Sequence, residues 1–362
     1  MDTNLKTDNF DFLNDVVRPQ CSYLTLSLED CARNLCNESE VVFFTGAGFS
    51  KAWNVNYPLS NDLFGIDNID ELRSQYNFVK LADSLSIMVP EPSSAQYLQL
   101  CYEYFSSLKF HLDAFKRYPS LMPHNLDETI IEEFEDEIRG FVVQRFAKKV
   151  GEDELNLNAK SNLNQELIEV FEKLSERIKH LTFISTNYDY IIEKIFNSIE
   201  GVNLNRGIVN RESFKAKSWE KSSISLFKIN GGFEVYKDQK GFYLDYNSNA
   251  SPNIILPSKD QNYDSKYYKS MFLKSAGRLR EAAKLVFVGY SLPIEDHTIR
   301  FLLKNFVDCE SRPKEVYVIN RDLNSALSVC EKVGQLFPTL LKNESIFAID
   351  GSLNQMSKHL PQ

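Results

Sequence analysis

The sequence has few cysteines and histidines, and neither type is spaced as metal ligands usually are. It contains six cysteines without a C-x-x-C pair, and five histidines in 362 residues. This pattern argues against a structural zinc site, and we expect no bound metal. Scattered thiols in a chain without a secretion signal predict free, mostly buried cysteines. The cysteines are Cys21, Cys31, Cys36, Cys101, Cys309 and Cys330.

The chain also lacks an excess of positive charge and any long apolar segment. It has 41 Lys and Arg against 50 Asp and Glu, a net charge of −9. An acidic chain gains no overall affinity for nucleic acid from counterion release, so we expect no direct nucleic-acid binding. No stretch suits a membrane span, and the start MDTNLKTDNFDF does not resemble a signal peptide. We therefore expect a cytoplasmic protein that binds no membrane.

Composition divides the chain into two kinds of sequence. Residues 61–180 hold only three glycines and are rich in Leu, Phe, Tyr, Glu and Lys at helical spacing. We interpret 61–180 as a largely helical insertion, and 1–60 with 181–350 as the main domain. Within the insertion, the acidic run 127–137 is typical of a solvated helix face rather than of a metal site. Residues 1–20 are polar and mixed, which predicts an arm or a capping segment.

Outside the insertion, short apolar runs alternate with helical stretches. This alternation predicts an α/β fold of Rossmann-like type, with a mostly parallel sheet and helices on both faces. A helix over 27–36, starting near Ser27 or Glu29, precedes the first run. Further helices are expected over 187–199, 265–283 and 296–306. The runs that predict strands are 41–44, 181–186, 225–229, 253–256, 284–288 and 315–319.

The first run leads directly into the motif T-G-A-G-F-S at residues 45–50. Glycines after a buried strand let the backbone approach a phosphate, and a helix starting there directs N–H groups toward it. A tight strand–helix turn that binds nothing would explain the same residues. The motif alone leaves both interpretations open.

Polar residues also end the next two strands. Asn187 and Asp189 follow a strand in S-T-N-Y-D, where side chains of an open α/β sheet face the ligand crevice. Either residue can instead cap the following helix. Asn230 and two glycines end the strand of K-I-N-G-G, although Asn-Gly is also a hairpin signal.

Two further buried strands stop at small or polar residues. One leads into G-Y-S-L-P at 289–293, followed by Asp296, and the other ends at Asn320 in V-I-N. The five motifs, in this order, resemble the sirtuin-like NAD-binding domain. In particular, the forms G-A-G-F-S and G-Y-S-L-P with Asp296 resemble the divergent bacterial sirtuin-like proteins of anti-phage defence, in which this fold hydrolyses NAD, more than they resemble the protein deacylases. The resemblance covers roughly residues 40–60 and 181–325.

The resemblance implies a role for each matching position. Gly46, Ala47 and Gly48 would line the pyrophosphate, with residues 49 and 50 beside it. Asn187 and Asp189 would hold the nicotinamide ribose and the attacking water. Gly289 and Ser291 would contact the adenosine ribose and phosphates. The implied NAD-binding residues are Gly46, Ala47, Gly48, Phe49, Ser50, Thr186, Gly289, Ser291, Asp296 and Asn320. The implied catalytic positions are Asn187, Asp189 and Asn230.

One position departs from the family pattern K-L-H-G-S, because Asn230 stands where the catalytic histidine is expected. An imidazole accepts a proton near neutral pH, whereas a carboxamide does not. Three explanations compete. In the first, Asn230 is the natural residue, and Asn187, Asp189 and bound water suffice for catalysis. In the second, it is an engineered change that keeps ligand binding and blocks turnover, and in the third the motif is misaligned and another group acts as the base. We slightly favour the engineered change, because the rest of the segment follows the pattern. We place His297 at the surface and His180 at the far end of its strand.

The resemblance implies an NAD+ hydrolase that cleaves the nicotinamide–ribose bond and acts as a gated defence effector, with turnover impaired by Asn230. A non-catalytic sensor of NAD or ADP-ribose is the alternative. A protein deacylase is less favoured, because the chain lacks the paired C-x-x-C zinc module. We assign gating and oligomer contacts to 61–180. The implied partners are further copies of the chain and a HerA-class ATPase, with an Argonaute-type protein as second choice.

Overall fold

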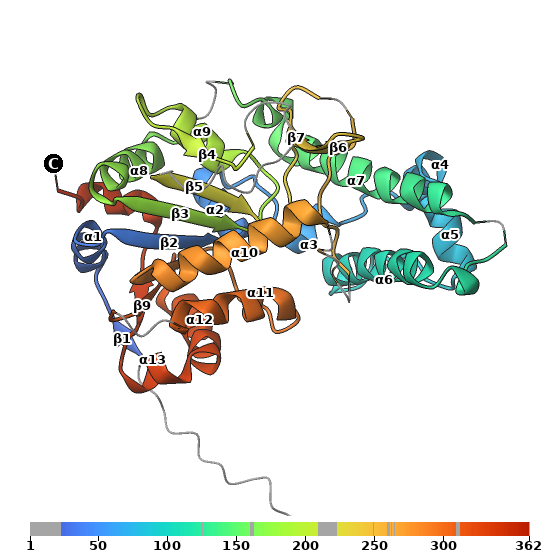
Figure 1. Ribbon diagram of the computed structural model, residues 1–362. Helices are drawn as coiled ribbons and strands as arrows, with labels where there is room; N and C mark the ends of the chain where they lie inside the picture. Colours follow the sequence, from blue (N-terminus) through green and yellow to red (C-terminus); the bar gives the residue numbers. More distant parts are fainter. Residues whose placement is uncertain are drawn as a thin grey trace, which may run out of the picture.

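The structure of the chain is a computed structural model. It describes residues 23–361 except 125, 160–162, 209–222, 249, 259–260, 262, 264 and 309–311. The predicted arm over 1–20 lies outside the described residues. Figure 1 shows a central sheet with helices packed around it, and a further group of helices beside it.

The sheet contains eight strands among the described residues, in the order β1-β10-β9-β8-β2-β3-β5-β4. All neighbouring strands in it run parallel. This architecture confirms the predicted fold class. The strands are β1 Leu24–Thr25, β2 Glu40–Thr45, β3 His180–Ser185, β4 Leu204–Asn205, β5 Ile224–Lys228, β8 Lys284–Val288, β9 Glu315–Asn320 and β10 Ile346–Asp350.

The strand order contains a point where the direction of winding reverses. From β2 the chain moves outward to β3 and β5 on one side, then returns to β8, β9 and β10 on the other. This is the doubly wound order of Rossmann-type sheets, whose ligand crevice lies at the carboxyl ends of the strands beside the reversal. The topology therefore places a crevice next to the ends of β2 and β8.

Alternation along the strands gives the sheet two apolar faces, as expected from the period of two. Val41 and Phe43 pack with α1, α8 and α9, while Val42 and Phe44 pack with α10, α11 and α12. Ser27 caps α1, since its hydroxyl accepts a hydrogen bond from the N–H of Asp30. The helices are α1 Leu28–Cys36, α2 Ala47–Trp53, α8 Gln165–Arg177, α9 Ile191–Asn197, α10 Lys266–Glu281, α11 His297–Leu303, α12 Leu323–Leu336 and α13 Pro338–Lys342.

The chain between α2 and α8 is helical, as predicted. Figure 1 shows α4 to α7 grouped on the side toward which the arrows of β2, β3 and β5 point. By contrast, α8 packs against α1 and α9, beside the sheet. The predicted insertion bounds of 61 and 180 stay a prediction. The helices are α3 Ser60–Leu63, α4 Ile69–Gln75, α5 Phe78–Ser84, α6 Tyr97–Arg117 and α7 Glu128–Val150, with η2 Glu152–Leu155 after them.

Part of the acidic run is not solvated. Glu135 on α7 is buried, and its carboxylate contacts Lys109, Lys116 and Arg139. The solvated-face interpretation is therefore wrong for this residue. Pairing with two lysines of α6 and with Arg139 of α7 itself offsets the cost of removing the carboxylate from water.

The strand predicted over 253–256 does not form. Ile254 makes only an isolated bridge to Gly231. Pro252 and Pro257 bracket this segment, and proline supplies no N–H for a sheet ladder. Instead, a two-stranded antiparallel hairpin that we did not predict lies nearby, with β6 Val235–Asp238 and β7 Gly241–Leu244.

The described cysteines match the prediction of free thiols. Cys31, Cys101 and Cys330 are free and buried, and Cys36 is free and partly buried. Cys21 and Cys309 lie outside the described residues. No helix in the described part of the chain is both long and apolar enough to cross a bilayer.

Candidate functional site

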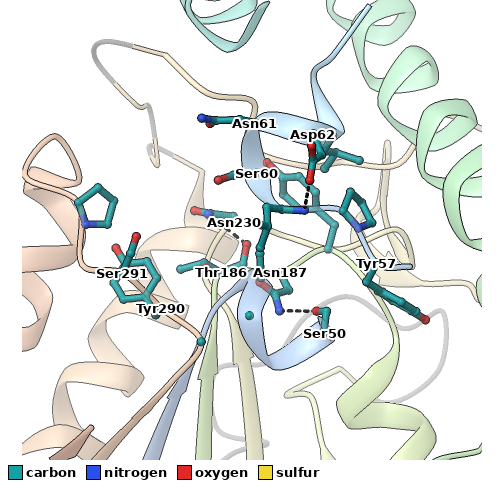
Figure 2. A pocket seen from close by; sticks show the side chains of 18 of the residues that line it. Ser50, Tyr57, Ser60, Asn61, Asp62, Thr186, Asn187, Asn230, Tyr290 and Ser291 are labelled. Carbon is teal, nitrogen blue, oxygen red and sulfur yellow. Dashed lines mark hydrogen bonds between the residues drawn. The ribbon is translucent and has the colours of Figure 1, made fainter. Parts of the chain in front are cut away.

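A cavity of about 740 Å³ lies at the carboxyl ends of the central strands. It is lined by the loops after β2, β3, β5 and β8, by Asn320 at the end of β9, by one side of α12, and by residues of the insertion and of the segment just before it. Figure 2 shows the side chains of these loops around one hollow. The predicted site residues that line the cavity are Ala47, Gly48, Ser50, Thr186, Asn187, Asp189, Asn230, Gly289, Ser291, Asp296 and Asn320.

Two predicted site residues do not line the cavity. The carbonyl of Gly46 accepts a hydrogen bond from Asn187 Nδ2 at 2.9 Å, so Gly46 helps to orient a side chain that lines the cavity. Phe49 is buried in the core, with its ring 6.1 Å from that of Phe171. Its N–H donates to the Gly46 carbonyl at 2.9 Å.

The glycines of the first and fourth motifs serve the contact between two loops. A Cβ on Gly48 would lie 2.6 Å from the Cα of Gly289, and a Cβ on Gly289 would lie 2.0 Å from the backbone nitrogen of Phe49. Gly289 also has φ +64°, a conformation that favours glycine. The N–H of Gly48 donates to the Gly289 carbonyl at 2.9 Å. Close packing of backbones thus requires these glycines whether or not a phosphate binds.

Asn187, Ser50 and Asp189 form one chain of hydrogen bonds. Asn187 Nδ2 donates to Ser50 Oγ at 2.8 Å, and Ser50 Oγ donates to Asp189 Oδ2 at 2.6 Å. Since Asn187 Nδ2 also donates to Gly46, its two amide hydrogens are committed to the protein. Its Oδ1 accepts no hydrogen bond from the described residues, so this oxygen can accept one from a ligand hydroxyl or a water.

Asp189 is a buried carboxylate at the base of the cavity. Burial raises the pKa of Asp189, although the bond from Ser50 and the charge of Lys228 act in the opposite direction. Its Oδ1 accepts a hydrogen bond at 3.1 Å from the N–H of Ile191, the first residue of α9, although the N-cap residue itself is Tyr190. A carboxylate with a raised pKa is easier to protonate than an ordinary one.

A cluster of four buried ionic side chains stands behind Asp189. Lys228 Nζ lies 2.8 Å from Glu193 Oε1 and 3.0 Å from Glu234 Oε2, and Arg206 contacts both carboxylates. Each of the four is at most 5% exposed. Sequence reasoning missed this cluster, because its members come from separate parts of the chain and share no motif spacing.

Asn230 is held at both ends of its amide. Its Nδ2 donates to the Thr186 carbonyl at 3.3 Å. The Tyr263 hydroxyl lies 3.0 Å from its Oδ1 and 2.7 Å from Gln261 Oε1, so these two oxygens share one hydroxyl hydrogen. No histidine of the described chain lines the cavity. His297 is exposed at the first turn of α11, and His180 begins β3 at the end away from the cavity, as both were predicted.

Asp296 forms a second acidic group, on the β8 side of the cavity. The Tyr290 hydroxyl donates to Asp296 Oδ2, and burial raises the pKa of this carboxyl. Burial, followed by the charge of Asp296, raises the pKa of Tyr102 to about 12. In Figure 2, Tyr290 and Ser291 lie on the opposite side of the view from Ser50 and Tyr57.

Two sets of lining residues were missed. The wall formed by the insertion and by the residues just before it is largely apolar, with Tyr57, Pro58, Leu59, Leu63, Phe64, Leu98, Tyr102 and Phe146. The α12 side contributes Ser325, Ser328, Val329 and Lys332. The spacing of the α12 set, at i, i+3, i+4 and i+7, places it on one helix face and was readable in the sequence. No pattern in the insertion marked its cavity-lining residues.

Part of the chain is similar to a known protein family. Residues 181–347 match the model of the SIR2-like domain. The match contains the second to fifth motifs, and the structure brings the first motif to the same cavity. The match to this family model supports a sirtuin-like family for the chain. No curated protein matches the sequence.

Several solved structures are similar to the chain. One is a Sir2 homologue–NAD complex, with 13% identity, TM-score 0.44, and coverage of 93% of this chain and 94% of that chain. Another is a mutant Sir2 homologue in complex with ADP-ribose, with 12% identity, TM-score 0.42, and coverage of 92% and 96%. At these values the likeness is too remote to assign an activity.

Proposed function

We propose that the chain is an NAD+ hydrolase that cleaves the nicotinamide–ribose bond, in the sirtuin-like branch that serves anti-phage defence. The linked Ser50, Asn187 and Asp189 carry this proposal, because they face a cavity at the reversal point of a doubly wound sheet. Such a crevice suits a dinucleotide, and the cavity volume of about 740 Å³ is ample for one.

The charges lining the cavity suit this bond cleavage. The nicotinamide of NAD+ is a cation, and positive charge moves onto the ribose as the bond to nitrogen breaks. Asp189 and Asp296 both line the cavity, so fixed negative groups can stabilise that developing charge. The free Oδ1 of Asn187 would accept a hydrogen bond from the ribose or from the attacking water.

Water then adds to the ribose carbon and must lose a proton. Asn230 cannot accept this proton, because a carboxamide is not a base at neutral pH. Asp189 is the nearest ionisable member of the hydrogen-bonded chain, and its raised pKa improves it as a base near neutral pH. We therefore assign the proton to Asp189, either directly or through the Ser50 hydroxyl.

The test is nicotinamide release from NAD+, followed by chromatography, for the wild type and for Asp189→Asn. We expect the rate to fall by about 10²–10⁴-fold in the variant. Asp308→Asn is the matched control, because the Asp308 side chain is 55% exposed and outside the cavity lining. Equal rates for the wild type and Asp189→Asn would contradict the assignment.

A binding subunit that senses NAD or ADP-ribose without cleaving it is the second candidate. Asn230 favours it, since both ends of its amide are already engaged by Thr186 and Tyr263. Tight NAD binding by calorimetry, without nicotinamide release even for Asn230→His, would establish the sensor. NAD-dependent removal of acetyl groups from a peptide would instead establish a deacylase.

A further inference from the structure

The cavity is lined by more acidic than basic side chains. Asp62, Asp189 and Asp296 line it, and Lys332 is the only cationic side chain among its lining residues in the described chain. A dinucleotide carries two negative charges on its pyrophosphate. An acidic cavity repels such a group unless a cation faces it, so the position of this one lysine decides where the pyrophosphate can lie.

Three backbone N–H groups of the first loop are already engaged within the protein. The N–H of Gly46 donates to the Val288 carbonyl at 3.2 Å, and the N–H groups of Gly48 and Phe49 donate to carbonyls at 2.9 Å. The N–H of Ala47, the first residue of α2, has no acceptor within the helix itself and can face a phosphate. A cationic side chain elsewhere in the cavity would add to the stabilisation of an anion that carries two charges.

Lys332 is positioned to stabilise a phosphate anion in the cavity. Its Nζ donates to the Ser291 carbonyl at 2.8 Å, in the loop that follows β8. The side chain is partly buried, and no carboxylate of the described chain pairs with it. Ser328 lies one turn earlier on the same face of α12 and also lines the cavity. Asp322 caps the start of α12 through the N–H of Ser325 and does not line the cavity.

We propose that Lys332, assisted by the Ser328 hydroxyl, forms a phosphate subsite that binds the pyrophosphate of the dinucleotide. This inference rests on the proposed function, because it names the group that holds the same ligand. The ammonium offers two further hydrogens beyond the one given to Ser291. A charge-assisted bond to a phosphate oxygen is about twice as strong as a neutral one. Ligands that lack the phosphates should not depend on Lys332.

The experiment is calorimetry of the full chain with NAD, ADP-ribose and adenosine. We expect Lys332→Met to weaken NAD and ADP-ribose binding by about 10-fold or more and to leave adenosine binding unchanged. Lys332→Arg should stay within about 3-fold of the wild type, since it keeps the charge. Lys342→Met, at an exposed lysine on α13, is the matched control and should bind like the wild type.

Salt provides a second readout. Raising sodium chloride should weaken ADP-ribose binding by the wild type more steeply than by Lys332→Met. Unchanged ADP-ribose affinity in Lys332→Met, with a wild type that binds NAD, would overturn the subsite and leave the proposed function standing. Equal losses for adenosine and ADP-ribose would also overturn it, because they indicate a structural role. A folded wild type that binds none of the three ligands overturns both proposals.

Discussion

At the scale of single residues, Asp189 combines a structural and a chemical role. It accepts hydrogen bonds from the first N–H of α9 and from the Ser50 hydroxyl, yet its pKa is raised by burial. A carboxyl whose pKa is raised on folding stabilises the fold when protonated. That contribution is fully present below about pH 4, where an unfolded aspartate is protonated, and is lost as the pH rises through the raised pKa.

Two opposite pH trends should follow for Asp189. Nicotinamide release should rise with pH through the raised pKa of Asp189, because the base must be ionised. Over the same range, the melting temperature of the wild type should fall relative to that of Asp189→Asn. Parallel melting curves for both proteins at all pH values would show that Asp189 titrates normally.

Asn230 allows a direct gain-of-function test. In Asn230→His, the ring Nδ1–H can donate to the Thr186 carbonyl, as Asn230 Nδ2 now does, which leaves Nε2 unprotonated and able to act as a base. We expect nicotinamide release to rise at least several-fold, and towards the 10²–10⁴-fold typical of a general base. A rate that stays at the wild-type level would contradict the view that a base is missing.

At the scale of elements, the contact between the loops after β2 and β8 shapes the cavity. Gly289→Ala should destabilise the protein by at least about 2 kcal/mol, because the new Cβ meets the Phe49 backbone and φ is +64°. Gly277→Ala is the matched control within α10, where a Cβ meets nothing within 4 Å. It should stabilise the helix by about 0.5–1 kcal/mol. Urea unfolding measures both changes.

A buried ion pair joins the end of the insertion to the site. Lys194 on α9 lies 2.6 Å from Glu154 in η2, and the same carboxylate accepts the hydroxyl of Tyr57 in the cavity wall. Lys194→Met leaves Glu154 buried without its cation and should cost about 3–5 kcal/mol. Adding Glu154→Gln should restore much of that loss. Equal unfolding free energies for the single and double variants would show that the pair is not coupled.

At the scale of the whole molecule, the insertion forms one wall of the cavity. This position supports our proposal that 61–180 gates the activity, since a shift of these helices would open or close the cavity. The proposed partners are other copies of the chain and a HerA-class ATPase, with an Argonaute-type protein as the second choice. We infer the partners from the family resemblance alone.

Co-expression with a HerA-class ATPase tests the assembly. We expect a single peak in size-exclusion chromatography that contains both proteins, and a change in nicotinamide release relative to the chain alone. The chain by itself should elute above its monomer mass of 41.8 kDa. Separate peaks for the two proteins would contradict the ATPase partner. Elution of the chain at its monomer mass would contradict the oligomer.

The sequence by itself determined the architecture and the main line of polar residues. Apolar runs followed by Asn187, Asn230 and Asn320 predicted the carboxyl edge of a parallel sheet. This prediction was possible because an apolar run and the polar residue after it are local properties of the sequence. Local patterns failed at 253–256, where flanking prolines prevent a ladder that the apolar run favours.

Only the tertiary structure decided which groups meet. It joined Ser50 to Asp189, gathered Lys228, Arg206 and two glutamates behind them, and turned Lys332 toward the loop after β8. These contacts link residues that are far apart in the chain, so no spacing announces them. Burial makes an unpaired charge costly, so each buried charge needs a partner of opposite sign. Only the folded chain shows which residue provides that partner.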